Sequence, residues 1–167
     1  MRVGATAFFV CAAACADIWL ADAQDSERDT LSALGGRWVA ECDGFQERAA
    51  CELEWTPGLG GDLMRVRYEV CADGGARLFA GDGVYKPSPG GFEGFWSDSN
   101  GSLHPLQASY ADGVLTTLWG RPETEEGRTV YAATGDGGLS VTDWVKVDGN
   151  WRQFMHASYE RADDRAQ

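Results

Sequence analysis

The segment HPLQASYADGVLTTLWGR, residues 104–121, decides the fold class. Its centre holds Asp112-Gly113, a pair that accepts the positive φ angles of a two-residue hairpin turn. Tyr, Val, Thr and Trp lie on both sides of this turn, as expected for two paired strands. When the segment folds at the turn, the following residues share one face of the hairpin: His104, Leu106, Tyr110, Leu115, Thr117, Trp119 and Arg121.

Four more pairs of this kind divide the chain: Asp73-Gly74, Asn100-Gly101, Asp136-Gly137 and Asp148-Gly149. Between them the sequence predicts strands over 36–42, 51–56, 63–71, 76–86, 91–97, 103–110, 113–120, 127–134, 138–147 and 150–160. An up-and-down antiparallel meander of this length closes most readily into a barrel, because closure leaves no exposed sheet edge. We therefore expect an all-β barrel of about eight to ten strands.

One short helix precedes the strands. Ser26 followed by Asp29 resembles a capping box, Leu31 and Leu34 form a small apolar stripe, and Gly35 can end the helix. Its ten residues are too few for a helix that is stable alone. We expect it to cover one end of the barrel.

The first predicted hairpin carries two cysteines. Placing Cys42 opposite Cys51 sets Ala40 opposite Leu53 and Trp38 opposite Trp55, so one face is apolar throughout. The register predicts a Cys42–Cys51 disulfide and leaves Cys71 unpaired on the other face. It also turns inward Met64, Val66, Tyr68, Val70, Phe92 and Trp96, with Phe79 beside Tyr68.

In the last three strands both faces carry bulky side chains. With two-residue turns, one face holds Thr129, Tyr131, Thr142, Trp144, Trp151, Gln153, Met155 and Tyr159. The opposite face holds Val130, Val141, Val145 and Phe154. The pattern leaves open which of the two faces points inward.

The amino terminus has the form of an export signal. Met1-Arg2 precedes an apolar run over 3–16, and Ala21-Asp22-Ala23 supplies the small residues that a signal peptidase reads. We expect residues 1–23 to be removed before Gln24, which leaves residues 24–167 as a single periplasmic or extracellular domain. A cut after Ala16 and lipid modification of Cys15 are the alternatives.

The charge of the chain excludes two classes of partner. The 167 residues include 26 acidic and 14 basic side chains, a formal net charge of −12. Nucleic acids and anionic membrane surfaces both attract basic faces, so we expect neither as a partner.

Two ends of the chain carry a resemblance to a known family. Gly36-Arg37-Trp38 opens the first strand and Tyr159-Glu160-Arg161 closes the last. This pairing resembles the calycin barrels, the lipocalins and their relatives. The resemblance implies that Arg161 stacks over the Trp38 indole and closes the barrel, a contact of about 0.5–2 kcal/mol.

A longer stretch extends the resemblance. Residues 92–161, with Gly94-Phe95-Trp96-Ser97-Asp98 and Trp119-Gly120, resemble secreted lipocalin-like bacterial domains of uncharacterised function. The second and third lipocalin motifs are not found, and ten strands exceed the lipocalin eight. Fatty-acid-binding-like and haem-binding ten-stranded barrels are therefore equally close cousins.

Catalytic and metal-binding patterns are weak. The sequence has no Gly-x-Ser-x-Gly elbow, and His104 and His156 form no zinc-ligand cluster. We expect no enzyme and no cofactor; the alternatives are haem ligation by a single histidine, and an isomerase or cyclase with Asp143 or His156 as base.

The aromatic residues suggest a binding function. The chain has seven Trp, and four of them lie on predicted interior strands, where they either fill the barrel as core or line a cavity: Trp55, Trp96, Trp119 and Trp144. In the second interpretation Arg121 or His104 meets the polar end of a small apolar or aromatic ligand, and the walls are Tyr68, Trp96, Trp119, Tyr131, Trp144 and Met155. We therefore predict an exported barrel that binds such a ligand non-covalently. The rival is an envelope interaction module with a filled core, with Cys71 free to form a disulfide with a partner.

Overall fold

The computed structural model describes residues 31–42 and 48–162. In this part of the chain ten strands follow one another: β1 (Gly36–Cys42), β2 (Ala49–Pro57), β3 (Met64–Ala72), β4 (Arg77–Ser88), β5 (Gly91–Asp98), β6 (Leu103–Ala111), β7 (Val114–Arg121), β8 (Glu125–Ala133), β9 (Leu139–Val147) and β10 (Asn150–Arg161). A single 3₁₀ turn, η1 (Leu59–Gly61), lies between β2 and β3.

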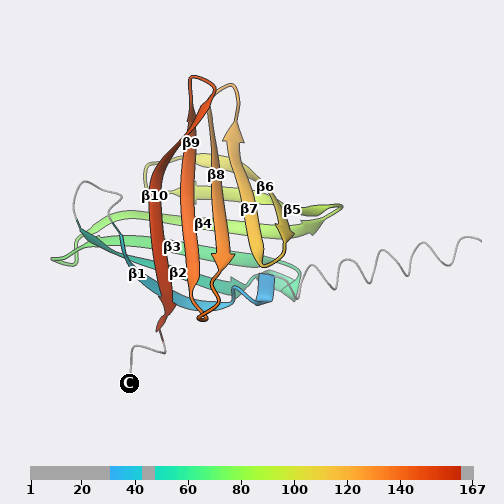
Figure 1. The fold of residues 1–167 in the computed structure, drawn as a ribbon. Coiled ribbons are helices and arrows are strands. Elements are labelled where there is room, and N and C mark those ends of the chain that lie inside the picture. Colours follow the sequence, from blue (N-terminus) through green and yellow to red (C-terminus); the bar gives the residue numbers. More distant parts are fainter. Residues whose placement is uncertain (1–30, 43–47, 163–167) are drawn as a thin grey trace, which may run out of the picture.

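Each strand pairs antiparallel with its neighbours in sequence, and β10 pairs with β1, so the sheet closes into a barrel. In Figure 1, β8, β9 and β10 cross in front of β1 to β4 at a steep angle and form the near wall. The predicted all-β, up-and-down barrel is confirmed. Among the residues described, the inward side chains of the strands form one continuous apolar core.

The predicted signal peptide and most of the predicted helix lie outside the described residues. Residues 31–35 form a short helical turn, in which the Leu34 amide donates to the Leu31 carbonyl at 3.0 Å. Leu31 and Leu34 are both buried in the barrel core. This turn therefore packs against the barrel just before β1 begins.

The barrel closes at Trp38 and Arg161, which are paired across β1 and β10. The guanidinium carbon of Arg161 lies 4.3 Å from the centre of the Trp38 ring, and Arg161 Nη1 donates to the Gly35 carbonyl at 2.8 Å. The indole Nε1 of Trp38 donates to the Leu34 carbonyl at 2.8 Å. The contact implied by the calycin resemblance is thus present, and it ties the residue-31–35 turn to the strand seam.

The predicted disulfide is present, but the predicted register of the first hairpin is wrong by two residues. Cys42 is bonded to Cys51, with the two Cα atoms 6.0 Å apart. In the backbone ladder, however, Cys51 lies opposite Ala40, and Cys42 lies opposite Ala49. A slip of two residues keeps every side chain on its own face, so the apolar pattern could not choose between these registers. Cys71 is unpaired and partly buried.

The prediction that Thr142 and Trp144 share a face with Thr129 and Tyr131 is wrong. Thr134 closes the β8–β9 turn by donating its amide to the Gly138 carbonyl, and Ala133 lies opposite Leu139. Five residues therefore separate the paired positions, and an odd number reverses the alternation that a two-residue turn predicts. As a result Thr142 and Trp144 face outward, whereas Asp143 faces the interior.

A β-bulge in β10 reverses the alternation of the side chains a second time. Gln153 pairs with Trp144 but Met155 pairs with Asp143, so Phe154 is the extra residue. Trp151 and Gln153 therefore lie on the outer face with Trp144. Met155 and Tyr159 are buried inside, so the eight residues predicted to share one face are divided between the two faces. Bulges of this kind re-aim the side chains that follow them.

Candidate functional site

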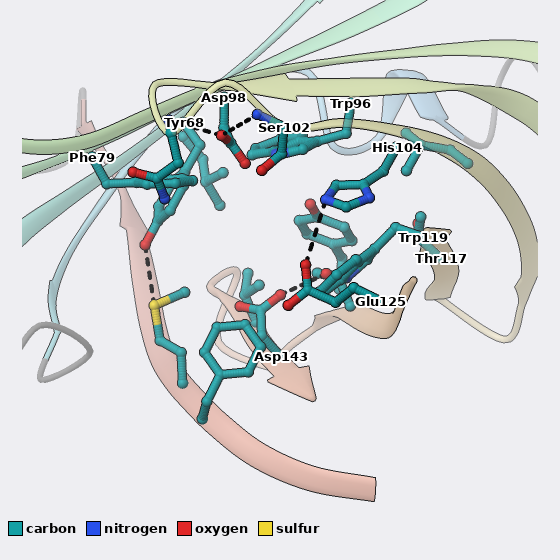
Figure 2. Close-up of a pocket in the computed structure, with 18 of the residues that line it drawn as sticks. Tyr68, Phe79, Trp96, Asp98, Ser102, His104, Thr117, Trp119, Glu125 and Asp143 are labelled. Atoms are coloured by element: carbon teal, nitrogen blue, oxygen red, sulfur yellow. Dashed lines mark hydrogen bonds and ion pairs between the residues drawn. The ribbon is translucent and has the colours of Figure 1, made fainter. Parts of the chain in front are cut away.

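The barrel encloses a cavity of about 300 Å³. Most of its walls are aromatic or apolar, and a few polar groups lie among them (Figure 2). The lining residues are Leu53, Tyr68, Phe79, Tyr85, Trp96, Asp98, Asn100, Ser102, His104, Leu106, Thr117, Trp119, Glu125, Thr129, Tyr131, Val141, Asp143, Phe154, Met155 and Tyr159.

Six of the eight predicted ligand-binding residues come together at this cavity: Tyr68, Trp96, His104, Trp119, Tyr131 and Met155. The other two do not. Trp144 lies on the outer face of β9, where the Arg128 guanidinium covers its ring at 4.3 Å. Arg121 is exposed at the end of β7, because Gly120 adopts φ +83° and interrupts the alternation of the strand. That the six cavity residues bind a ligand stays a prediction.

Three glycines in strand interiors make room for the two cavity tryptophans. A Cβ atom at Gly81 would lie 2.0 Å from Trp96, and one at Gly83 would lie 3.1 Å from the other side of the same indole. A Cβ atom at Gly127 would lie 1.9 Å from Trp119. Each indole thus lies against bare backbone of the neighbouring strand, which keeps it at the wall. Sequence reasoning missed this role, although a glycine within a strand pattern signals such a close approach.

Trp55, which is 1% exposed, packs against two of the tyrosines that line the cavity. Its ring contacts Tyr85 and Tyr131, each with ring centres 5.3 Å apart. The Tyr85 hydroxyl lies 3.2 Å from Thr117 Oγ1. Burial raises the pKa of Tyr85 to about 12, so this hydroxyl stays neutral at physiological pH.

Asp143 is the buried acid of the cavity. It is 8% exposed, and Thr129 Oγ1 donates to its Oδ1 at 2.5 Å. Burial raises the pKa of Asp143 to about 6, and the hydrogen bond from Thr129 opposes this shift only in part. Figure 2 shows the carboxyl pointing into the space that the labelled side chains surround. The sequence could not place Asp143 on this wall, because the face on which Asp143 lies depends on the number of residues in the β8–β9 turn.

Two more tyrosines place hydroxyls beside the cavity. The Tyr68 hydroxyl donates to Met155 Sδ at 3.1 Å and also lies 3.1 Å from Cys51 Sγ. The buried Tyr159 hydroxyl has no hydrogen-bond partner among the described residues. Burial raises the pKa of both phenols well above the ordinary value, so both are neutral hydrogen-bonding groups.

The rim of the cavity is polar. His104 Nε2 lies 3.7 Å from Glu125 Oε2, and the His104 ring packs 5.3 Å from that of Trp119 (Figure 2). Asn100, Glu125 and Phe154 are exposed although they line the cavity, so it opens to solvent at this end.

The second histidine lies elsewhere. His156 is exposed on β10, and its Nδ1 lies 2.8 Å from Thr142 Oγ1 on the outer face. His104 is therefore the only histidine that could reach a molecule in the cavity. Residues 31–42 and 48–162 contain no group of three or more His, Cys, Asp or Glu side chains that could hold a metal ion. Over the same residues no helix is long and apolar enough to span a membrane.

Comparison with known proteins leaves the function to be argued from this geometry. The chain matches no model of a known protein family, and no curated protein matches it.

Proposed function

We propose that this protein is an exported β-barrel of the calycin type that binds a small hydrophobic or aromatic molecule non-covalently in its interior. The observation that carries the proposal is the cavity of about 300 Å³, walled by aromatic rings and open to solvent at one end. Ligand pockets are concave and mostly apolar, with a few polar groups, and this volume lies at the lower end of their range.

The walls supply the free energy that such binding needs. A ligand that buries about 200 Å² of apolar surface gains about 5 kcal/mol. The two indoles and the ring of Tyr131 present flat surfaces that suit a planar or chain-like molecule. The hydroxyls of Tyr68 and Thr117 offer neutral hydrogen-bonding groups to a polar substituent.

The cavity also argues against the rival function, a non-catalytic interaction module with a filled core. An interaction module needs no opening in its barrel. In a module with a filled core, side chains from opposite walls would occupy the space that is a cavity in this protein. A disulfide partner at Cys71 is compatible with either function. Non-reducing gels of the purified protein test this partner.

Export is part of the proposal. The Cys42–Cys51 disulfide suits an oxidising compartment, where such bonds persist. We propose that residues 1–23 direct the chain to the periplasm or the medium and are cleaved before Gln24. Cell fractionation followed by sequencing of the mature amino terminus tests both points; a cytoplasmic protein that retains Met1 would contradict them.

Asp143 supports a second candidate, an isomerase or cyclase. A buried carboxyl with a raised pKa inside a cavity is the arrangement expected of a general base. His156, the other base considered, faces outward and supports no such function. Turnover of a bound ligand that Asp143→Asn abolishes would favour the enzyme; binding without turnover favours the carrier.

The binding function is tested by tryptophan fluorescence titrated with fatty acids, haem and small aromatic compounds. We expect saturable quenching by at least one class, and a weaker response in Trp96→Phe and Trp119→Phe, since both indoles line the cavity. Trp144→Phe is the matched control, because Trp144 faces outward. No saturable response from any class would refute the proposed function.

A further inference from the structure

The charged side chains that line the cavity are strongly biased in sign. Three are carboxylates, those of Asp98, Glu125 and Asp143, and the only basic group is the His104 imidazole. No lysine or arginine lines the cavity in the described part of the chain. A carboxylate or phosphate of a ligand would therefore meet no fixed positive charge inside the barrel.

Two of the three carboxylates are already satisfied by the protein or by solvent. Asp98 Oδ1 accepts the backbone amides of Asn100 and Ser102 at 2.9 and 3.1 Å, as in an ordinary hairpin turn. Glu125 lies at the exposed rim, where water can hydrate its carboxylate and His104 Nε2 lies 3.7 Å away. Neither group needs a ligand to complete its interactions.

Asp143 differs from both. Its Oδ1 accepts one hydrogen bond from the Thr129 hydroxyl, and no donor among the described residues reaches Oδ2. Asp143 is nevertheless buried, with 8% of the residue exposed, and it lines the cavity. Burying an ionised carboxylate without a cation or several donors is unfavourable. A cation that entered the cavity would relieve this cost.

The surrounding rings suit a cation as well. The indoles of Trp96 and Trp119 and the phenol rings of Tyr68 and Tyr131 line the same space. The faces of aromatic rings attract ammonium groups, most strongly where water is excluded. An organic ammonium ion can thus use the carboxylate and the rings together, while its apolar part fills the rest of the cavity.

We propose that the ligand of this cavity is a small amphipathic amine. Its protonated nitrogen pairs with the Asp143 carboxylate. Its apolar or aromatic body lies with the indoles of Trp96 and Trp119 on one side and Met155 on the other. This inference rests on the proposed binding function and narrows it to one ligand class. The buried and unpartnered hydroxyl of Tyr159 is a second polar group beside the same cavity.

The test uses three probes of similar shape and different charge: 2-phenylethylamine, 2-phenylethanol and 3-phenylpropionate. Affinities are measured at pH 7.5 by isothermal titration calorimetry on the mature protein. We expect the amine to bind about tenfold to a hundredfold more tightly than the alcohol, as a charge-assisted hydrogen bond contributes, and the acid to bind most weakly.

The variant Asp143→Asn keeps the shape of the side chain and removes its charge. We expect it to bind the amine and the alcohol within about twofold of each other. Asp148→Asn is the matched control, because Asp148 is an exposed carboxylate at the β9–β10 turn and its φ of 50° tolerates Asn. We expect this control to keep the wild-type preference for the amine. The comparison of probes on the wild-type protein does not depend on whether the variant folds.

Four results overturn the inference. Equal or tighter binding of the alcohol or the acid by the wild-type protein would show that the cavity does not select a cation. Retention of the amine preference by folded Asp143→Asn would place the cation elsewhere. Failure of all three probes, with saturable binding of a fatty acid, haem or an uncharged aromatic compound, would overturn the amine and leave the binding function standing. Failure of every compound would overturn both.

Discussion

Asp143→Asn is predicted to make the ligand-free protein more stable at neutral pH but not at acidic pH. Burial raises the pKa of Asp143 from 3.8 to about 6 in the folded state. Between these two values the folded protein holds a proton that the unfolded chain has lost. Stability therefore falls as pH rises through this window; the cost is absent below the unfolded pKa and complete above the folded one.

The size of the effect follows from the shift. One pKa unit corresponds to about 1.4 kcal/mol, so the buried carboxylate costs the folded state about 3 kcal/mol above pH 7. Asparagine carries no such charge and can still accept the hydrogen bond from Thr129. We expect the variant to exceed the wild type by about 3 kcal/mol at pH 7.5 and by less than about 1 kcal/mol at pH 4.

The assay is urea unfolding followed by tryptophan fluorescence at several values of pH between 4 and 7.5. The assay uses low micromolar protein, because the sequence pI of about 4.4 is close to the lowest pH and proteins tend to associate near their pI. Other titratable groups contribute equally to both proteins and cancel in the difference. Those that line the cavity are Tyr68, Tyr85, Asp98, His104, Glu125, Tyr131 and Tyr159. A difference in stability that is the same at pH 4 and pH 7.5 would refute the reasoning, since it would mean that the Asp143 carboxyl ionises as it does in water.

Three further substitutions test the seam, the disulfide and the cavity wall. Arg161→Ala removes the stacking on Trp38 and the hydrogen bonds to the residue-31–35 turn, and should lower the free energy of unfolding by about 1–3 kcal/mol in urea titrations. Cys51→Ser opens a disulfide loop with a sequence separation of 9, and should cost about 2–3 kcal/mol in the same assay. Gly127→Ala places a Cβ where the Trp119 indole lies, and should weaken ligand binding at least fivefold in fluorescence titrations.

Matched substitutions separate these effects from general damage. Arg152→Ala removes an exposed guanidinium from the same strand as Arg161, and Cys71→Ser removes the unpaired thiol; both should leave stability within about 0.5 kcal/mol. Gly74→Ala adds a methyl group in open space and should leave binding unchanged. If a control variant loses as much as its partner, the corresponding contact does not have the role assigned to it.

The cavity shows how far sequence patterns can predict a site. Alternation within β3, β5, β6 and β7 placed Tyr68, Trp96, His104 and Trp119 on the inner wall, because the backbone of each strand is regular around these residues. The same alternation failed for Arg121, where a glycine at positive φ ends the regular strand. Local patterns therefore predict a wall only as far as the backbone stays regular.

Asp143 marks the limit of that reasoning. Its position inside the barrel depends on one extra residue in the β8–β9 turn, and Met155 returns to the inside only through the bulge at Phe154. Each irregularity reverses the face of all residues that follow. Both faces of β9 carry bulky side chains, so no contrast in hydrophobicity revealed the reversal in advance.

By itself, the sequence determined the meander, the closure of the barrel and the disulfide, because turn dipeptides, alternating side chains and paired cysteines act over short distances along the chain. Only the tertiary structure decided that the interior is hollow and that its buried acid is Asp143. A cavity is the space that ten strands leave between them, and its volume depends on how the bare backbone of Gly81 and Gly127 lets two indoles lie against the walls.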